Sequence, residues 1–391
     1  MLQAKLKNGK LITLASLPKQ EIIKAKQDEF FCPTCEEPVL VKAGMTMIPH
    51  FAHRQRLECA SNDYGEGPYH EQGKLVLYNW LRMQQVDVRL EPYIQEIGQR
   101  PDLYAELRNR KIAIEYQCAR IPIELLSQRN EGYKGMGITP IWILGAKHFQ
   151  RIRKYHFKID QFLLSFIHKF SAEFPSTLYF FCPQTLYFII VQHIHVLSPR
   201  YAMGLFRFIP IRDLKFPNIF FQQNRNDTWL YHQWNQEKKA FRLRPAKNKY
   251  GSERTWHQWL YKKGAHKETL PSIVYLPIQS QYLMKTPLWN WQSRLCLELL
   301  LPLPIGAVFS LDRCYRILHY QPQHHLFSLI RGMDNPVHNY LMLLKKLGII
   351  EELDTNIFQK VQDIHLHKNI EASLEGDARI MNQLLHCSTI G

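Results

Sequence analysis

The stretch Arg100–Gln117, RPDLYAELRNRKIAIEYQ, decides how the middle of this chain folds. Two runs rich in apolar, aromatic and β-branched residues flank a polar turn, which is the pattern of a β-hairpin. If Asn109 lies at the turn, the numbers of paired residues add up to about 218 or 219, because the two strands run antiparallel. The pattern therefore predicts that Asp102 lies opposite Tyr116 or Gln117.

Two carboxylates and an amide gather at one end of this hairpin. Side chains alternate along a strand, so Glu115 and Gln117 share a face, and the register that pairs Asp102 with Gln117 puts Asp102 on that face too. Two neighbouring carboxylates repel each other and are costly to bury without a cation. Mg²⁺ or Mn²⁺ would compensate their charge and activate water for phosphodiester hydrolysis. The alternative is a polar hairpin end without catalysis.

The segments around the hairpin predict three regions. A helix (HEQGKLVLYNWLRMQQ) and a strand (VDVRL) precede the hairpin, and a helix (IELLSQRNEGYKGMG) and a buried strand (TPIWILG) follow it. This order predicts a compact α/β domain over residues 63–150. Residues 1–62 hold short strands, the first two joined at Asn8-Gly9, and are expected to form a small β-rich module. Residues 151–391 are expected to form a mainly helical accessory region that binds DNA.

Composition and charge limit the class of protein. The chain has 391 residues, of which 46% are hydrophobic, and its formal net charge is +16. Such a positive balance favours a polyanionic partner, with nucleic acid as the leading candidate. There is no apolar run long enough to span a membrane and no apolar N-terminal stretch, so we expect a cytoplasmic protein without membrane insertion. The eight cysteines are too sparse for a disulfide framework.

One basic stretch, residues 238–267, contains ten lysines and arginines and one acidic residue. Aromatic residues lie between the cations, an arrangement that suits single-stranded nucleic acid because rings stack on bases while cations follow the backbone. Lys262 and Lys263 are the candidate phosphate contacts. The alternative is a solvated basic face whose Trp256 and Trp259 pack inward.

A second candidate metal site lies near the N-terminus. Cys32 and Cys35 in CPTC are spaced so that both thiolates can bind one zinc ion. His50 and His53 in HFAH would complete the set, although their spacing is one residue shorter than usual. Cys59 is a possible replacement, so the fourth ligand is either His53 or Cys59. We expect structural zinc in a zinc-ribbon-like module, and the alternative is a pair of buried free thiols.

Together these motifs resemble the PD-(D/E)xK nuclease core, with Gln117 in the position of the lysine. More narrowly, RPDL, AIEYQ, the WIL strand and the upstream CPTC and HFAH resemble the competence protein CoiA family. The helix that carries Arg129 and Tyr133 is part of this likeness. These two residues lie one turn apart on one helix face, from which they would contact phosphate beside the metal.

The resemblance implies a restriction-endonuclease-like domain that acts on single-stranded or branched DNA. Its expected role is to promote recombination of incoming DNA during natural transformation, together with a recombinase and other competence proteins. Two alternatives are kept: a catalytically inactive DNA-binding recombination mediator, and a restriction-type defence nuclease.

The resemblance also implies roles for single residues. Asp102 and Glu115 would bind the catalytic Mg²⁺ or Mn²⁺. Glu71 would be an auxiliary ligand or would position water, and Gln117 would orient the attacking water or the substrate. An amide can only donate and accept hydrogen bonds, whereas a lysine ammonium stabilises negative charge on the phosphorus. The residue at 117 therefore separates the active nuclease from the inactive mediator.

Overall fold

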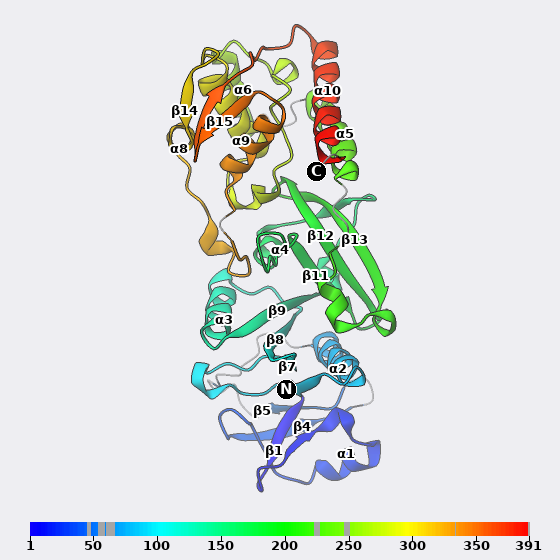
Figure 1. Cartoon of the computed structure of the whole chain (residues 1–391). Coiled ribbons are helices and arrows are strands. Elements are labelled where there is room, and N and C mark those ends of the chain that lie inside the picture. The colour runs from blue at the N-terminus through cyan, green and yellow to red at the C-terminus, as the bar shows by residue number, and fades with distance from the viewer. Residues whose placement is uncertain are drawn as a thin grey trace. The chain divides into compact units, whose positions relative to one another are not determined.

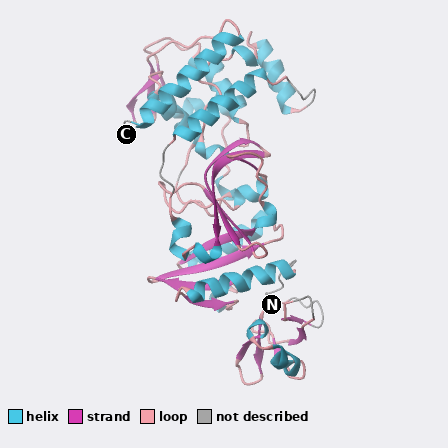
Figure 2. Ribbon diagram, turned by 90° about the vertical axis from the view of Figure 1, so that its right-hand side faces the viewer, coloured by secondary structure: helices cyan, strands magenta, loops and turns pink. Residues whose placement is uncertain are grey.

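The computed structural model describes residues 1–44, 48–53, 59, 67–222, 227–245, 251–332 and 334–389. They form two compact units. The first comprises residues 1–194, 204–221 and 325–331, and the second comprises residues 195–203, 222–324 and 332–391. The first unit carries two β-sheets, and the second is mainly helical (Figure 2).

The N-terminal sheet has five antiparallel strands. They are β1 (Gln3–Leu6), β2 (Leu11–Thr13), β3 (Phe30–Phe31), β4 (Pro38–Lys42) and β5 (His50–His53), in the order β2-β1-β3-β4-β5. Helix α1 (Lys19–Ala25) lies between β2 and β3 in the chain. The small core beneath the sheet includes Phe30, Phe51 and Cys32. The prediction of a β-rich N-terminal module is confirmed.

The central sheet has eight strands, drawn from cyan to green in Figure 1. Its strands are β6 (Asp87–Leu90), β7 (Leu103–Leu107), β8 (Arg110–Gln117), β9 (Ile138–Gly145), β10 (His156–Lys158), β11 (Thr177–Cys182), β12 (Tyr187–Ser198) and β13 (Tyr201–Pro210). Their order is β10-β13-β12-β11-β9-β8-β7-β6, with β9 parallel to both β8 and β11. Helix α2 (Pro68–Met83) precedes β6, and α3 (Ile123–Gly135) connects the parallel strands β8 and β9. A short helix α4 (Gln161–Ser165) follows β10.

The hairpin of β7 and β8 turns through two residues. Leu107 pairs with Arg110, so the turn consists of Arg108 and Asn109, which both have positive φ, 47° and 62°. Such a turn matches the twist of antiparallel strands. The turn predicted at Asn109 is therefore present, but its centre lies half a residue earlier than assumed.

This shift changes the predicted register. The last pair of the hairpin is Leu103 with Ile114. Continuing the ladder places Asp102 opposite Glu115, so the predicted pairing of Asp102 with Tyr116 or Gln117 is wrong. Asp102 precedes the first residue of β7, and its side chain contacts His70 and Lys74 of α2, so its expected common face with Glu115 stays a prediction.

Helices α2 and α3 pack on opposite faces of β8. Tyr116 is buried beneath α2, where a Cβ atom at Gly73 would lie 1.9 Å from its Cε1 atom. Only glycine lets the helix approach the strand this closely. Glu115 points the other way and meets Arg129 and Tyr133 of α3. Because side chains alternate along β8, the strand presents the apolar Tyr116 to α2 and the carboxylate of Glu115 to α3.

The sheet continues beyond the boundary predicted at residue 150. Four strands between His156 and Pro210 belong to it, so the expected helical character of residues 151–391 is wrong for this part (Figure 1). The run STLYFFCPQTLYFII forms β11, a turn and the start of β12, with Phe181 opposite Phe188. Aromatic and β-branched residues favour strands, and they dominate this run.

The second unit is mainly helical, as expected. Its helices are α5 (Thr228–Leu243), α6 (Ser252–Lys262), α7 (Leu288–Leu295), α8 (Leu311–Leu318), α9 (Pro336–Lys346) and α10 (Ile370–Thr389). A small antiparallel sheet of β14 (Val308–Ser310), β15 (Ile350–Asp354) and β16 (Ile357–Lys360) has the order β14-β16-β15. Among the described helices of both units, none combines the length and apolar character needed to cross a membrane.

Candidate functional site

Asp102 and Glu115 meet at one end of the β7–β8 hairpin. The backbone N–H of Tyr116 donates a hydrogen bond of 2.7 Å to Asp102 Oδ2, which fixes this carboxylate at the end of the strand. The charge of Asp102 also helps to raise the pKa of Glu115, so the two carboxylates influence each other electrostatically. The structure therefore brings together the two residues that the hairpin pattern singled out.

Glu115 is buried between the sheet and α3. Burial raises the pKa of Glu115 to about 7, the Arg129 guanidinium opposes the rise, and the charge of Asp102 adds to it. Glu115 Oε1 accepts hydrogen bonds from Arg129 Nη2, at 2.5 Å, and from the Tyr133 hydroxyl. Arg129 and Tyr133 share one helix face, as predicted, and here both contact the carboxylate. Their expected role at phosphate stays a prediction.

Helix α2 supplies three more polar side chains. His70 Nε2 lies 3.4 Å from Asp102 Oδ2, and Glu71 is buried in the first turn of the helix. The ammonium of Lys74, whose side chain is fully buried, lies 3.5 Å from Glu71 Oε1 and 3.7 Å from Asp102 Oδ1. Lys74 thus connects the predicted auxiliary ligand Glu71 to Asp102.

Glu91 completes this group from the end of β6. Its Oε1 lies 2.5 Å from the Lys74 ammonium, and its Oε2 accepts a 2.9 Å hydrogen bond from the backbone N–H of Leu2. The backbone of Glu91 has φ 47°, a left-handed conformation that is uncommon outside glycine. Our sequence analysis identified neither Lys74 nor Glu91. The available signal was Lys74 three residues after Glu71, a spacing that brings two helical side chains together.

Gln117 lies at the end of β8, half-buried. Its Nε2 donates a 2.8 Å hydrogen bond to the carbonyl oxygen of Ala119, so the amide stabilises the turn after the strand. Continuing alternation along β8 keeps Gln117 on the same face as Glu115. The role of Gln117 in orienting water stays a prediction.

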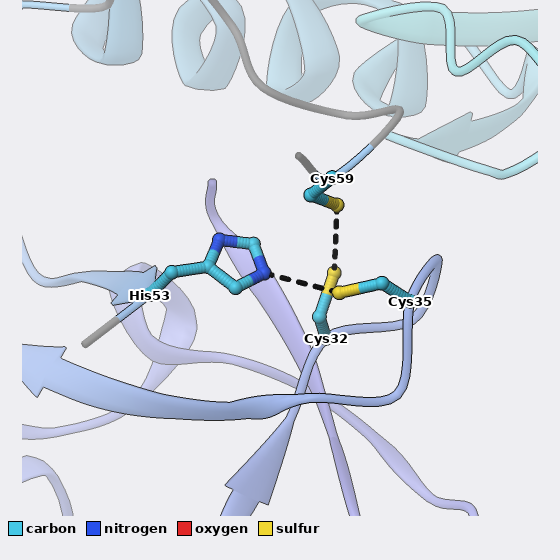
Figure 3. A group of neighbouring side chains, drawn as sticks. All are labelled: Cys32, Cys35, His53 and Cys59. Atoms are coloured by element: carbon cyan, nitrogen blue, oxygen red, sulfur yellow. Dashed lines mark hydrogen bonds between the residues drawn. The ribbon is translucent and has the colours of Figure 1, made fainter. Parts of the chain in front are cut away.

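A separate group of sulfur and nitrogen ligands lies in the N-terminal module (Figure 3). Cys32, Cys35, His53 and Cys59 have ligand atoms that all lie within 4.8 Å of one another. Cys32 Sγ is 3.9 Å from Cys59 Sγ, and Cys35 Sγ is 3.3 Å from His53 Nε2. A tetrahedral zinc site places two sulfurs about 3.8 Å apart and a sulfur and a nitrogen about 3.5 Å apart. The donor set and spacing are therefore compatible with zinc.

The cluster differs from the predicted ligand set at one position. Cys59 takes part and His50 does not, because His50 and His53 are three residues apart on β5 and point to opposite faces. The His50 Nδ1 atom instead lies 3.0 Å from the carbonyl oxygen of Ile48. His53 and Cys59, which were predicted as alternatives for the fourth ligand, both belong to the cluster. His50, which was predicted as a ligand, lies outside it.

The described residues of the basic stretch 238–267 do not form one exposed track, since Lys238, Arg242 and Lys267 are buried. Residues 246–250 lie outside the described part of the chain. Trp256 is buried, and Lys263 lies 3.2 Å from Glu298. Trp259 is partly buried and donates a hydrogen bond of 3.2 Å to Glu298. Lys262 is exposed at the end of α6. The alternative in which the tryptophans pack inward fits the described residues better than the stacking groove.

Comparisons with known proteins agree over most of the chain, from residue 14 to residue 374. Three family models match it: the N-terminal domain of competence protein CoiA over residues 14–62, its nuclease-like domain over residues 66–224, and its C-terminal domain over residues 229–374. Competence protein CoiA of Bacillus subtilis (strain 168) is 33% identical over 282 residues, which cover 72% of this chain and 74% of that protein. No solved structure matches the chain significantly.

Proposed function

This chain belongs to the competence protein CoiA family, and from that premise we propose that its nuclease-like domain is a metal-dependent DNA nuclease. Family membership supports a role in competence. The observation that carries the catalytic proposal is the meeting of Asp102 and Glu115 at the end of the β7–β8 hairpin, with Glu71 connected to Asp102 through Lys74. The proposed substrate is single-stranded or branched DNA that enters recombination.

The oxygen donors of this site suit a hard divalent cation. Asp102, Glu115 and Glu71 offer carboxylates, the ligands that Mg²⁺ and Mn²⁺ prefer. When bound, such an ion polarises a phosphoryl oxygen and lowers the pKa of water. Burial and the charge of Asp102 make a negative Glu115 costly, as its raised pKa reflects, and a cation shared by both carboxylates would relieve that cost.

The protein's own residues have separate tasks in this proposal. Asp102 is oriented by the Tyr116 N–H, so its carboxylate is set in place before substrate binds. Arg129 pairs with Glu115 in the structure, and its side chain is 24% exposed, so it can turn to a phosphate that approaches from solvent. Gln117 would orient water from the same strand face. We propose a restriction-endonuclease-like arrangement of the domain on this basis.

A cleavage assay tests the proposal. Purified protein is incubated with single-stranded, duplex and branched DNA in Mg²⁺ or Mn²⁺, beside Asp102→Asn and Glu115→Gln. We expect cleavage by the wild type and at least a 100-fold loss in both variants, a size typical of removing a group that stabilises the transition state. Glu106→Gln, on the exposed part of β7, is the matched control and should cleave normally. If the wild type binds every substrate and cuts none, the nuclease proposal is wrong.

One observation favours the second candidate, a DNA-binding recombination mediator without catalysis. Glu115 is already compensated by Arg129 and by the Tyr133 hydroxyl, so in this arrangement the carboxylate has a partner other than a metal. In that case binding would survive in Asp102→Asn and Glu115→Gln. Efficient cutting of duplex DNA alone would instead favour a restriction-type defence nuclease.

We also propose a structural zinc ion at Cys32, Cys35, His53 and Cys59. All four positions would be filled by protein ligands, which is the pattern of structural rather than catalytic zinc. The small core of the N-terminal module makes such an ion valuable for its stability.

Lys262 and Lys263 remain the proposed backbone contacts of DNA in the second unit. Replacing both by alanine should weaken DNA binding and reduce its dependence on salt concentration, because each phosphate contact releases counterions. Unchanged affinity and unchanged salt dependence would remove this contact from the proposal.

A further inference from the structure

Lys74 is a buried cation at the centre of the proposed nuclease site. Its side chain is fully buried, and its ammonium lies 2.5 Å from Glu91, 3.5 Å from Glu71 and 3.7 Å from Asp102. A lysine is rarely buried completely unless it is paired. Here it is surrounded by three carboxylates that come from α2, from the end of β6 and from the start of the hairpin.

Hydrolysis of a phosphodiester needs positive charge near the phosphorus. The oxygen of the attacking water forms a new bond to phosphorus, the bond to the leaving sugar oxygen breaks, and the proton of the water ends on that oxygen. Negative charge grows on the phosphoryl oxygens during this step, and fixed positive charge stabilises it. Gln117 is neutral and its amide nitrogen is bound to the carbonyl of Ala119, so it does not provide that charge.

We propose that Lys74 provides the fixed positive charge of this site. This role rests on the proposed nuclease function and adds Lys74 to the residues that take part in it. Because Lys74 is buried behind Asp102 and Glu71, it acts through these carboxylates and is a positioning residue: it holds them together against their mutual repulsion and sets the charge around the metal. Glu91 anchors the ammonium from the other side.

The arrangement of Glu91 explains why the ammonium stays in place. Glu91 receives the Leu2 N–H on one oxygen and Lys74 on the other, so neither its side chain nor the ammonium can shift without breaking a buried contact. A side chain that is locked by such partners can hold a reactive group within a fraction of an ångström. The geometry thus favours preorganisation over a loosely placed surface charge.

The main difficulty of a test is that removing Lys74 takes a buried cation away from three carboxylates at once, of which Glu71 keeps the N-terminal ammonium at 3.6 Å. Breaking one partner of a buried pair is strongly destabilising, whereas replacing both partners together is often tolerated. We therefore design the decisive variant as Lys74→Met with Glu91→Gln. The glutamine keeps an oxygen that can accept the Leu2 N–H. Glu91→Gln alone separates the loss of the Glu91 charge from the loss of Lys74, and Glu106→Gln is the control outside the site.

The experiment measures single-turnover cleavage of the best DNA substrate over a range of Mn²⁺ concentrations, together with melting temperature and DNA affinity. We expect Glu106→Gln, outside the site, to cleave like the wild type, and Glu91→Gln, which loosens the hold on the ammonium, to lose less rate than the double variant. The double variant should fold and bind DNA, yet lose about 100-fold or more in rate and need more Mn²⁺. Gln117→Ala should lose no more than about tenfold, since an amide contributes one neutral hydrogen bond.

A pair of single variants keeps the test decisive if the double variant does not fold. Lys74→Arg retains the charge and Lys74→Gln removes it, so at matched folding the arginine variant should cleave faster by tenfold or more. Equal rates in these two, or a folded double variant as fast as Glu91→Gln, would show that Lys74 only fills space, and the nuclease proposal would survive. If the wild type itself does not cleave, the nuclease proposal and the role of Lys74 fall together.

Discussion

Replacing Cys59 by serine tests the proposed zinc site of the N-terminal module. Cys59 Sγ lies 3.9 Å from Cys32 Sγ, close to the roughly 3.8 Å that separates two sulfurs in a tetrahedral zinc site. His50 lies on the other face of its strand, with Nδ1 against the carbonyl oxygen of Ile48. We expect Cys59→Ser to retain little zinc and His50→Asn to retain about one ion per chain.

The size of the effect follows from the linkage between metal binding and folding. A hundredfold weaker zinc affinity lowers the stability of the bound state by about 2.7 kcal/mol when the metal is otherwise saturating. The core of the module is a single small cluster around Phe30 and Phe51, so a loss of this size is a large part of its stability. Cys59→Ser should therefore expose the module to protease, and a chelator should do the same to the wild type.

The zinc content per chain is measured with a chromogenic chelator after zinc is released from the purified protein. Limited proteolysis then follows cleavage within residues 1–62. Zinc content that survives in Cys59→Ser but is lost in His50→Asn would refute the argument from strand alternation. Absence of zinc from the wild type, with no protection by added metal, would refute the metal site as a whole.

Three further substitutions probe stability elsewhere in the chain. Asp377→Asn should lower the free energy of unfolding by about 3–5 kcal/mol in a urea titration, because Arg242, which donates to Asp377 at 2.5 and 2.8 Å, would stay buried without its counter-charge; a change below about 1 kcal/mol contradicts this. Burial lowers the pKa of His168 to about 3, below the 6.5 of an unfolded histidine. As the pH drops below 6.5 the unfolded chain takes up a proton that the folded chain does not, so the free energy of unfolding falls. The loss is about 2 kcal/mol at pH 5, and His168→Gln should show a smaller fall than the wild type when unfolding is compared at pH 7 and pH 5. Gly73→Ala should lower the free energy of unfolding by about 1–3 kcal/mol, and with it the melting temperature, because the added Cβ would overlap Tyr116. An unchanged melting curve would show that α2 can move away from the strand.

The elements around the hairpin were predictable because their signals are local. Alternation in RPDLYAEL and KIAIEYQ, a turn at Asn109 and helical spacing on either side each depend on residues close together in the chain. The exact register of the hairpin could not be predicted, since it depends on whether the turn holds one central residue or the pair Arg108 and Asn109. One residue of difference at a turn moves every pair along the ladder.

The strands after residue 150 were missed for a different reason. The run that forms β11 and the start of β12 is apolar on both faces, and most of β11 is buried. A continuous apolar run does not show whether it is a buried strand or a buried helix, since neither period is visible in it. The position of these strands in the central sheet is a tertiary fact that local patterns do not carry.

The two candidate metal sites show the same division between local and tertiary information. The exclusion of His50 was available from the sequence, because HFAH already suggested a short strand and residues three apart on a strand point to opposite faces. Cys59 could be named only as an alternative ligand, since β4 and β5 lie between it and Cys35 and local spacing does not tell which side chains the folded module brings together. Likewise Asp102 and Glu115 follow from one hairpin, whereas Lys74 and Glu91 are recognised only when α2 and β6 pack together.

Lys74 changes which residue decides between an active nuclease and an inactive DNA-binding protein. If the positive charge comes from α2, a glutamine at 117 is no obstacle to catalysis, and the deciding contact becomes that of Glu115 with Arg129. The two sides of the site then differ in character: Asp102 is held by the Tyr116 N–H and by a fully buried lysine, whereas the arginine on Glu115 is 24% exposed. A partly exposed guanidinium can be given up to water or phosphate at smaller cost than a buried ammonium. In the proposed nuclease, a metal ion would therefore bind Asp102 first and then displace Arg129 from Glu115. Arg129→Ala should lower the Mn²⁺ concentration needed for binding. A higher requirement would mean that Arg129 holds Glu115 in the orientation that binds metal.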